Sequence, residues 1–474
     1  MTPSASGERP ISDEELQRFR ETMSGAVLDP ADPAYEEARR VWNGTIDRRP
    51  VLIAQCRSAD DIVAAVAFAR QHDLLVAVRG GGHGVAGYAV CDDGLVIDLS
   101  SMQDVEVDAD ARTVRVQPGA RWADVDRATQ PHGLATPGGE VSATGVAGLT
   151  LGGGMGYLRR KYGLSCDNLV SADVVTADGL KVLASDREHP DLFWALRGGG
   201  GNFGVVSSFV FRLHPVGPEV ATLTPFFPLE DARRVLFAWR AFTESAPDEA
   251  TTAFAVWVLP DDPGLPEPLR GLPACVLDGL YAGAPEAGEA LFRSLRAVAT
   301  PLIDMSGRTP YVEAQSGLDA LFPDGDLYYW KSLFLDALSD DAIEQILARS
   351  QTRPNPRILV ILRHLGGALG RVAPDATAYS NRSAQYMLSI DGAWSDPAET
   401  ERNIAWVRDF WSAMRPFSNG GVYLNFPGFG EGGRALWEAS HGTNFERLRT
   451  VKDRYDPTNL FRMNQNIRPT QAQD

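Results

Sequence analysis

Four glycine-rich stretches lie within the first 204 residues, and they constrain the fold more than any other feature of the chain. They occupy residues 79–84, 137–139, 152–156 and 198–204. Glycine lets backbone N–H groups approach a ligand closely and adopts positive φ, so loops of this kind suit phosphates and flat rings. One such cluster is more often a tight turn. Four clusters here, with almost none like them afterwards, predict a large ligand that carries a pyrophosphate.

One of these loops imitates a dinucleotide-binding fingerprint. Residues 82–87 match G-x-G-x-x-G and follow an expected strand at 74–78. In a Rossmann fold the fingerprint must open a helix. Here residues 95–99 form another apolar run of strand type, so the sequence argues against a Rossmann site.

The remaining periodicity predicts a mixture of helices and strands. Helices are expected over residues 58–71 and 231–242, paired strands over 105–107 and 114–116, and a hairpin over 174–183 with Asp178-Gly179 at its turn. Because the helices and strands do not alternate strictly, the expected fold class is α+β rather than a doubly wound sheet.

Composition narrows the choice of partners. The 474 residues carry a net charge of −17, whereas nucleic acid and anionic membranes select for clustered Lys and Arg, so neither is an expected partner. The chain shows no apolar run long enough to span a bilayer and no signal peptide, so a cytoplasmic location is expected. The four cysteines form no C-x-x-C pair, and His132, His189 and His441 lack metal-ligand spacing. No metal is expected.

His83 is the odd residue in the first glycine loop. A histidine among glycines has no neighbouring side chains in sequence, so its imidazole is expected to point at whatever the loop holds. A solvent-facing or backbone-bonded histidine is an equal alternative on the local sequence alone.

Several of these segments together carry a family signature. The chain resembles the FAD-linked oxidases of the vanillyl-alcohol oxidase/PCMH fold, in their berberine-bridge-enzyme-like branch. The resemblance spans nearly the whole chain in family order and rests on residues 77–84, 148–168, 173–179, 197–206, 454–461 and 464–467.

The resemblance implies an architecture. An FAD domain would comprise residues 1–215, an inserted substrate domain of antiparallel sheet and helices would comprise residues 216–420, and residues 421–474 would return to the FAD domain.

The resemblance also implies how FAD is held. His83 would bond covalently to the 8α-methyl of the flavin. Many relatives add a cysteinyl bond, but Val141 stands at that position here, so a single link is expected, and Cys166 is interpreted as a small buried residue. The other FAD-binding residues implied are Arg79, Gly80, Gly81, Gly82, Gly84, Gly138, Gly139, Thr144, Gly145, Gly148, Gly152, Gly153, Gly154, Gly156, Val206, Asn464 and Asn466.

Tyr423 is the candidate base that takes a proton as the substrate loses hydride. Alternation over residues 422–426 predicts a strand with Tyr423 and Asn425 on one face. Related enzymes have Tyr-x-Asn-Tyr here, whereas this chain has Phe426 as the last residue. An ordinary half-buried strand tyrosine is an equal alternative.

The substrate side is expected to be aromatic. The glutamate base of the plant enzymes has no counterpart in residues 366–372, which contain no carboxylate. Residues of the inserted domain that could line a flat pocket are Trp257, Tyr328, Tyr329, Trp330, His364 and Tyr386, although each alone is more often a core residue.

The leading hypothesis is an oxidase that moves hydride from an alcohol or amine carbon of a small or medium secondary metabolite to FAD, with O₂ as acceptor giving H₂O₂. One alternative keeps the flavin and performs oxygenation or oxidative cyclisation. Another is a flavoprotein that sequesters a drug without turnover. The protein is expected to be a monomer or a homodimer that binds no partner beyond substrate and O₂.

Overall fold

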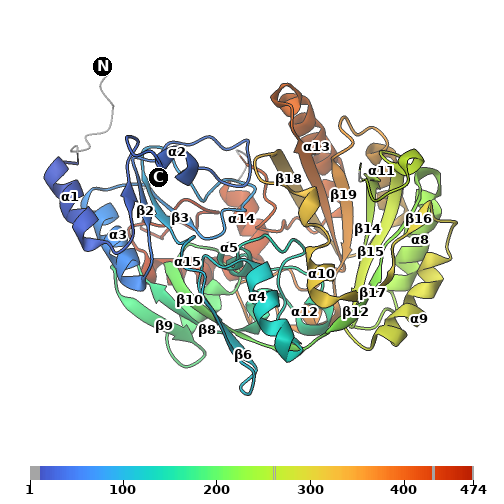
Figure 1. Ribbon diagram of the computed structural model, residues 1–474, viewed down its shortest axis with the longest axis horizontal. Coiled ribbons are helices and arrows are strands. Elements are labelled where there is room, and N and C mark those ends of the chain that lie inside the picture. Colours follow the sequence, from blue (N-terminus) through green and yellow to red (C-terminus); the bar gives the residue numbers. More distant parts are fainter. Residues whose placement is uncertain (1–10, 260, 262, 430–432, 472–474) are drawn as a thin grey trace.

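The strands assemble into two smaller sheets in one half of the molecule and one large sheet in the other, as the computed structural model shows (Figure 1). It describes residues 11–259, 261, 263–429 and 433–471. Residues 1–10, on which the signal-peptide expectation partly rests, lie outside that range.

The first half combines a four-stranded and a five-stranded sheet. In the former, β2, β4 and β3 run parallel and β1 pairs antiparallel with β2. The five-stranded sheet is antiparallel. In sheet order the strands are β1 (Val27–Leu28), β2 (Leu52–Gln55), β4 (Leu95–Asp98) and β3 (Val76–Arg79), then β5 (Val105–Asp108), β6 (Thr113–Val116), β10 (Val205–Arg212), β8 (Leu169–Val175) and β9 (Lys181–Ser185); β7 (Leu134–Ala135) pairs with β11 (His214–Pro215).

The other half is built on a nine-stranded antiparallel sheet. Its strands are, in order, β16 (Ile303–Asp304), β13 (Pro225–Pro228), β15 (Pro273–Tyr281), β14 (Ala250–Val258), β19 (Leu359–His364), β20 (Tyr386–Trp394) and β18 (Leu327–Leu335). In addition, β12 (Glu219–Leu223) pairs with β15, and β17 (Gly307–Pro310) pairs with β12.

Helices cover the sheets. The α-helices are α1 (Asp13–Thr22), α2 (Tyr35–Ala38), α3 (Ala59–Gln71), α4 (Trp122–Thr129), α5 (Val146–Leu151), α6 (Arg159–Tyr162), α7 (Pro190–Leu196), α8 (Ala232–Thr243), α9 (Pro285–Arg296), α10 (Tyr311–Ser316), α11 (Asp340–Ser350), α12 (Gly367–Arg371), α13 (Thr400–Met414), α14 (Arg434–His441) and α15 (Phe445–Tyr455). Short 3₁₀ turns occupy Gln130–His132, Ser165–Asn168, Leu229–Asp231, Glu267–Leu269, Asp319–Leu321, Pro397–Glu399, Arg415–Phe417 and Gly442–Asn444.

The α+β expectation is confirmed, and so are its strongest local elements. Ser58 caps α3 by accepting a hydrogen bond from the Asp61 N–H. Strands β5 and β6 pair as expected. In the β8–β9 hairpin, Gly179 has φ +84° at the turn, which glycine adopts without a Cβ clash.

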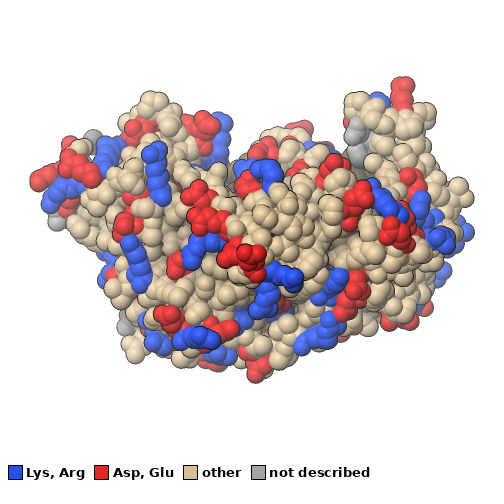
Figure 2. Space-filling view, turned by 60° about the horizontal axis from the view of Figure 1, so that its bottom comes forward, with Lys and Arg blue, Asp and Glu red and all other residues tan. Residues whose placement is uncertain are grey.

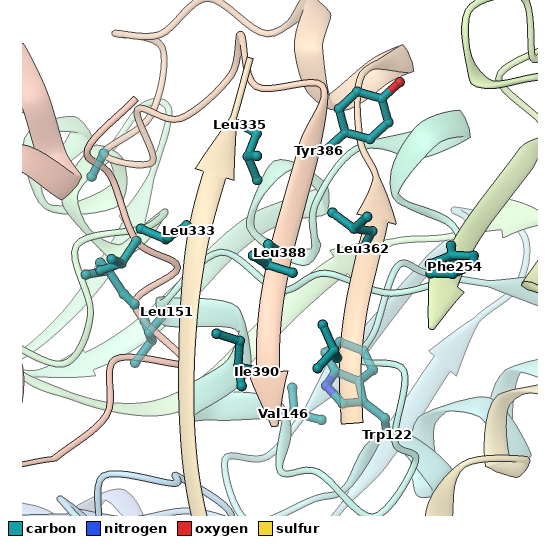
Figure 3. Close-up of a cluster of buried hydrophobic side chains, with 14 of the residues drawn as sticks. Trp122, Val146, Leu151, Phe254, Leu333, Leu335, Leu362, Tyr386, Leu388 and Ile390 are labelled. Carbon is teal, nitrogen blue, oxygen red and sulfur yellow. The ribbon is translucent and has the colours of Figure 1, made fainter. Parts of the chain in front are cut away.

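One face of the large sheet is buried under helices α8, α11 and α13. Leu362, Leu388 and Ile390 point from neighbouring strands into this apolar layer, and Tyr386 lies on the same face (Figure 3). Since side chains alternate along a strand, the residues between them point to the opposite face, toward the first half of the molecule.

The C-terminal segment returns to the first half of the molecule. Leu460 and Phe461 pack in the same apolar cluster as strands β2 to β4 and helix α3. All four cysteines belong to the described residues and are buried and free, so the interpretation of Cys166 as a buried residue is confirmed.

The surface and the helices add two general findings. Lys and Arg are interspersed with Asp and Glu over the face shown in Figure 2. Among the described residues, no helix is long and apolar enough to cross a membrane.

Candidate active site

A cavity of about 360 Å³ joins the glycine loops to the uncovered face of the large sheet. Its lining includes the first glycine loop, residues 144–152 around α5, residues 200–206 and the C-terminal residues 461–465. On the other side it is lined by side chains of β13, β14, β15, β18, β19 and β20. The cavity therefore lies where segments far apart in sequence meet.

Backbone forms much of the first wall. Gly84, Gly148 and Gly201 line the cavity, and a Cβ added at any of them would meet no other described atom within 4 Å. A side chain there would occupy the cavity itself. Gly81 and Gly145 lie so close that a Cβ on either would come within 2.6 Å of the other's backbone. This wall is the bare cradle that a large cofactor needs.

Most of the expected cofactor-binding residues line the cavity. These are Gly80, Gly81, Gly82, His83, Gly84, Thr144, Gly145, Gly148, Gly152, Val206 and Asn464.

Five other glycines expected to bind the cofactor lie behind this lining. A Cβ at Gly156 would meet the Gly138 carbonyl oxygen at 2.5 Å, and one at Gly138 would meet the Trp122 ring. Gly153 packs on Tyr379 and Gly154 on Ser165, while Gly139 packs on Leu149. These glycines permit close packing between the loops.

Arg79 and Asn466 also lie outside the lining. Arg79 at the end of β3 forms a buried ion pair with Asp98 at the end of β4, with Nε donating to Oδ1 over 2.9 Å. Its guanidinium therefore holds the ends of β3 and β4 together. At the C-terminus, the cavity is instead lined by Asn464 and Gln465.

His83 is the site's central titratable group. Its ring stacks on Trp42 with centroids 4.0 Å apart, and its buried Nε2 has no hydrogen-bond partner among the described residues. Burial lowers the pKa of His83 to about 4, so the imidazole is neutral at physiological pH. A neutral ring that lines a cavity and keeps one nitrogen unpartnered is suited to bond a ligand.

The strand expected over residues 422–426 is wrong. The N–H groups of Val422 and Tyr423 donate to the side chains of Ser440 and Ser332, and the Phe426 N–H closes a turn on the Tyr423 carbonyl over 2.8 Å. The N–H groups of Val422 and Tyr423 thus bond to serine side chains and not to the backbone of a neighbouring strand.

Tyr423 and Asn425 nevertheless meet at the cavity. The Tyr423 hydroxyl oxygen accepts from Asn425 Nδ2 at 2.9 Å, Met155 N at 3.1 Å and Gly154 N at 3.2 Å. Burial raises the pKa of Tyr423 to about 12, although these three donors act in the opposite direction. They are groups that would stabilise a phenolate.

Two of the six expected aromatic positions, Trp257 and Trp330, line the cavity. The expectation is wrong for Tyr328, His364 and Tyr386. Tyr386 and His364 point to the helix-covered face, where Tyr386 hydrogen-bonds Thr243 and His364 contacts Arg160. Tyr328 stacks on Trp42 instead, with centroids 3.8 Å apart.

Tyr329 also lies outside the cavity lining. Its ring packs edge-on against Phe429, with centroids 5.0 Å apart.

No sequence pattern indicates the charged network at the sheet end of the cavity. Glu140 bridges two arginines, with Oε1 2.8 Å from Arg159 Nη1 and Oε2 2.7 Å from Arg363 Nε. Asp391 lies 3.8 Å from Arg363, and Asp278 accepts from the Tyr157 hydroxyl at 2.8 Å. Burial raises the pKa of Asp278 and of Asp391 to about 6. Three of these residues lie on β15, β19 and β20 and the others on α6 and the loops near it, so only the tertiary fold brings them together.

Comparison with known proteins agrees with this geometry. Residues 50–184 match the FAD binding domain model, and residues 422–468 match the model described as berberine and berberine like. An FAD-linked oxidoreductase of Bacillus subtilis is 32% identical over 94% of this chain and 97% of its own length. A xylooligosaccharide oxidase of Thermothelomyces thermophilus is 29% identical over 91% of this chain and 90% of its own.

A solved structure has the same fold. The 6-hydroxy-D-nicotine oxidase of Arthrobacter nicotinovorans superposes with a TM-score of 0.83 at 28% identity, covering 94% of this chain and 98% of its own.

Proposed function

Since the chain belongs to the berberine-like family of FAD-linked oxidoreductases, we propose that it is an oxidase that removes hydride from an alcohol or amine carbon of a small or medium secondary metabolite, with O₂ as electron acceptor. The observation that carries this proposal is His83, which has a buried Nε2 without a partner among the described residues and lines a cavity that runs from the glycine cradle to the large sheet. One such cavity accommodates a cofactor at one end and a substrate at the other.

FAD fits the cradle, and we propose that it is bound covalently through His83 alone. The cavity-lining glycines leave room for it, and the buried Nε2 of His83 and Oδ1 of Asn464 lack partners among the described residues. Val141 lines the cavity where relatives carry a second attachment, while Cys166 is buried away from the lining.

The proposed division of labour follows from chemistry. FAD supplies a two-electron acceptor. Tyr423 takes the proton that the substrate O–H or N–H loses, because its oxygen is surrounded by three donors that favour the charged form. Asn425 orients that oxygen. The apolar sheet face excludes water from the reacting atoms.

We also propose that residues 1–215 and 421–474 form the FAD domain and residues 216–420 the substrate domain. The large sheet uses only strands from residue 219 to 394, and the C-terminal Leu460 and Phe461 pack against the first sheet.

Anaerobic reduction is the direct test of the proposed function. Purified protein is mixed without O₂ with a panel of alcohols and amines, and loss of the oxidised flavin spectrum is followed. Readmitted air should restore the spectrum and release one H₂O₂ per two-electron turnover. Oxygen from O₂ in the product would instead indicate an oxygenase, and a panel that binds without bleaching the flavin would indicate sequestration.

A further inference from the structure

Two polar atoms at the sheet end of the cavity stand out because they are buried and lack a hydrogen-bond partner in the described part of the chain. They are Nε1 of Trp330 and Oδ1 of Asp391. Trp330 is 5% exposed and Asp391 is 1% exposed. Both residues line the cavity, and they are direct cross-strand partners on β18 and β20.

The pair combines one donor with one acceptor. The indole N–H only donates, and the ionised carboxylate only accepts. Leaving both buried without partners is costly, since each forfeits its hydrogen bonds to water. A hydroxyl group satisfies both, because it donates its hydrogen to Asp391 and accepts from Trp330.

The other polar groups nearby are partly engaged with one another. Arg363 donates to Glu140 and to Ser389, and Ser389 donates to the second carboxylate oxygen of Asp391 over 3.1 Å. Asp278 is paired with the Tyr157 hydroxyl. Trp330 and Asp391 are the residues of this end whose fully buried polar atoms have no hydrogen-bond partner among the described residues.

The lining over β13 and β14, beside the charged network, is apolar and shaped for rings. Ala253 and Ala255 face the cavity from the middle of the sheet and leave space above β14. Trp257 and Phe226 line the cavity from neighbouring positions, with ring centroids 6.3 Å apart. An oligosaccharide would bury many hydroxyls against these side chains without partners, whereas an aromatic skeleton would fill the space.

We propose that this end of the cavity binds a largely apolar, ring-containing substrate and anchors it through one hydroxyl, which donates to Asp391 and accepts from Trp330. The proposal deepens the proposed function and rests on it, because it names the substrate class of the same site. It distinguishes this chain from a sugar oxidase.

Three matched probes test the anchor. Naphthalene has no hydroxyl, 2-methoxynaphthalene can only accept, and 2-naphthol can both donate and accept. Dissociation constants for the flavin-loaded protein are measured from the change in flavin absorbance without turnover. A buried hydrogen bond to a charged group predicts that 2-naphthol binds about 10- to 100-fold more tightly than naphthalene, with the ether in between. Xylobiose serves as the sugar probe and should bind more weakly than 2-naphthol.

Variants then separate the two contacts. Trp330→Phe keeps a ring and should weaken both 2-naphthol and the ether by about 5- to 10-fold, whereas Asp391→Asn should weaken 2-naphthol alone by about 10-fold. Trp257→Phe is the control, since it also trims a cavity-lining indole but should weaken all three probes equally.

Equal affinities for the three probes, or tighter binding of xylobiose, would overturn the anchor. That failure is distinguishable from failure of the proposed function. If 2-naphthol shows the expected pattern but the panel never bleaches the flavin, the anchor stands and the oxidase does not. If a sugar bleaches the flavin while 2-naphthol fails to bind, the oxidase stands and the anchor does not.

Discussion

The phenolic oxygen of Tyr423 is the best-supported single atom for proton removal, because its environment is built from donors. Two backbone N–H groups of the third glycine loop and the Asn425 amide converge on it. Donors of this kind stabilise a negative oxygen, while burial opposes ionisation and leaves the pKa at about 12. The group is therefore protonated in the resting protein near neutral pH.

This balance predicts a pH dependence. If the phenolate is the base, the rate of flavin reduction should rise by about 10-fold per pH unit between pH 7 and 10, because the ionised fraction rises by that factor below the pKa. Tyr423→Phe should reduce the flavin about 10²- to 10⁴-fold more slowly and lose this slope. Anaerobic stopped-flow measures both, with FAD content as the control for folding. An unchanged slope in Tyr423→Phe would place proton removal on another group.

His83 carries a prediction about attachment. Acid-precipitated protein should stay yellow, and a peptide containing His83 should carry the mass of FAD. His83→Ala should bind FAD that is released by acid, because the glycine cradle remains and only the bonding nitrogen is lost. Flavin on a Cys166 peptide would contradict the single link.

At the scale of elements, residues 42–44 join the His83 loop to the large sheet. Trp42 stacks between His83 and Tyr328, and its indole N–H donates to the Phe322 carbonyl over 2.8 Å. The buried Asn43 amide donates to the carbonyls of Val85 and Tyr328 and accepts from the Tyr328 N–H. This segment fixes the His83 ring from the side away from the glycines.

We therefore expect Trp42 to position His83 for flavin attachment. Trp42→Leu should slow covalent incorporation of FAD into apoprotein by about 10-fold or more, because the ring loses the stacking partner that restricts its orientation. Trp42→Phe should restore most of the rate. The acid-stable flavin fraction is followed over time, with Trp257→Leu, a change at a half-buried indole on β14 that lines the cavity, as the control. Equal rates in Trp42→Leu and the control would show that the stack is only structural.

The sequence pattern predicts an element correctly where the residues that begin or end the element lie within the same segment. Ser58 caps α3, and Asp178-Gly179 closes the β8–β9 hairpin, as expected. The strand expected at Tyr423 failed for a reason that lies outside the segment. Ser332 and Ser440 capture its N–H groups, and both are distant in sequence.

At the scale of the whole molecule, the same limit applies to the site. The glycine loops and His83 were accessible to sequence reasoning because ligand and backbone meet within one segment. Asp391 could not be predicted in this way, because its proposed role depends on which face of β20 it occupies and on its pairing with Trp330 on the neighbouring strand β18. Tyr386 and His364 show the reverse error, because alternation places both on the covered face.

Seven buried histidines and aspartates of the described chain fall into two opposing sets. Burial lowers the pKa of His83, His214 and His441 to about 4 and that of His364 to about 2. Burial raises the pKa of Asp126 to about 7 and those of Asp278 and Asp391 to about 6. Near pH 5 the unfolded chain binds protons at the four histidines, whereas the folded chain binds them at the three aspartates. The histidines make stability fall as the pH drops below 6.5, and the aspartates make it fall as the pH rises above 3.8.

The two sets nearly cancel, which predicts a shallow pH dependence for the apoprotein. Unfolding near pH 5 takes up about one proton at these seven groups, so their net contribution should make the free energy of unfolding rise by only about 1.4 kcal/mol per pH unit. Asp126→Asn removes one opposing group and should roughly double that slope, whereas His441→Gln should bring it close to zero. Urea titrations at pH 4.5, 5.0 and 5.5 measure how the free energy of unfolding changes with pH. Each variant is compared by this slope, because a change in packing alters the free energy equally at all three pH values and leaves the slope unchanged. If the slope of the unaltered protein were several times steeper, the buried aspartates would be ionised in the folded chain at pH 5. Asp278 and Asp391 would then not be groups that ionise only near pH 6.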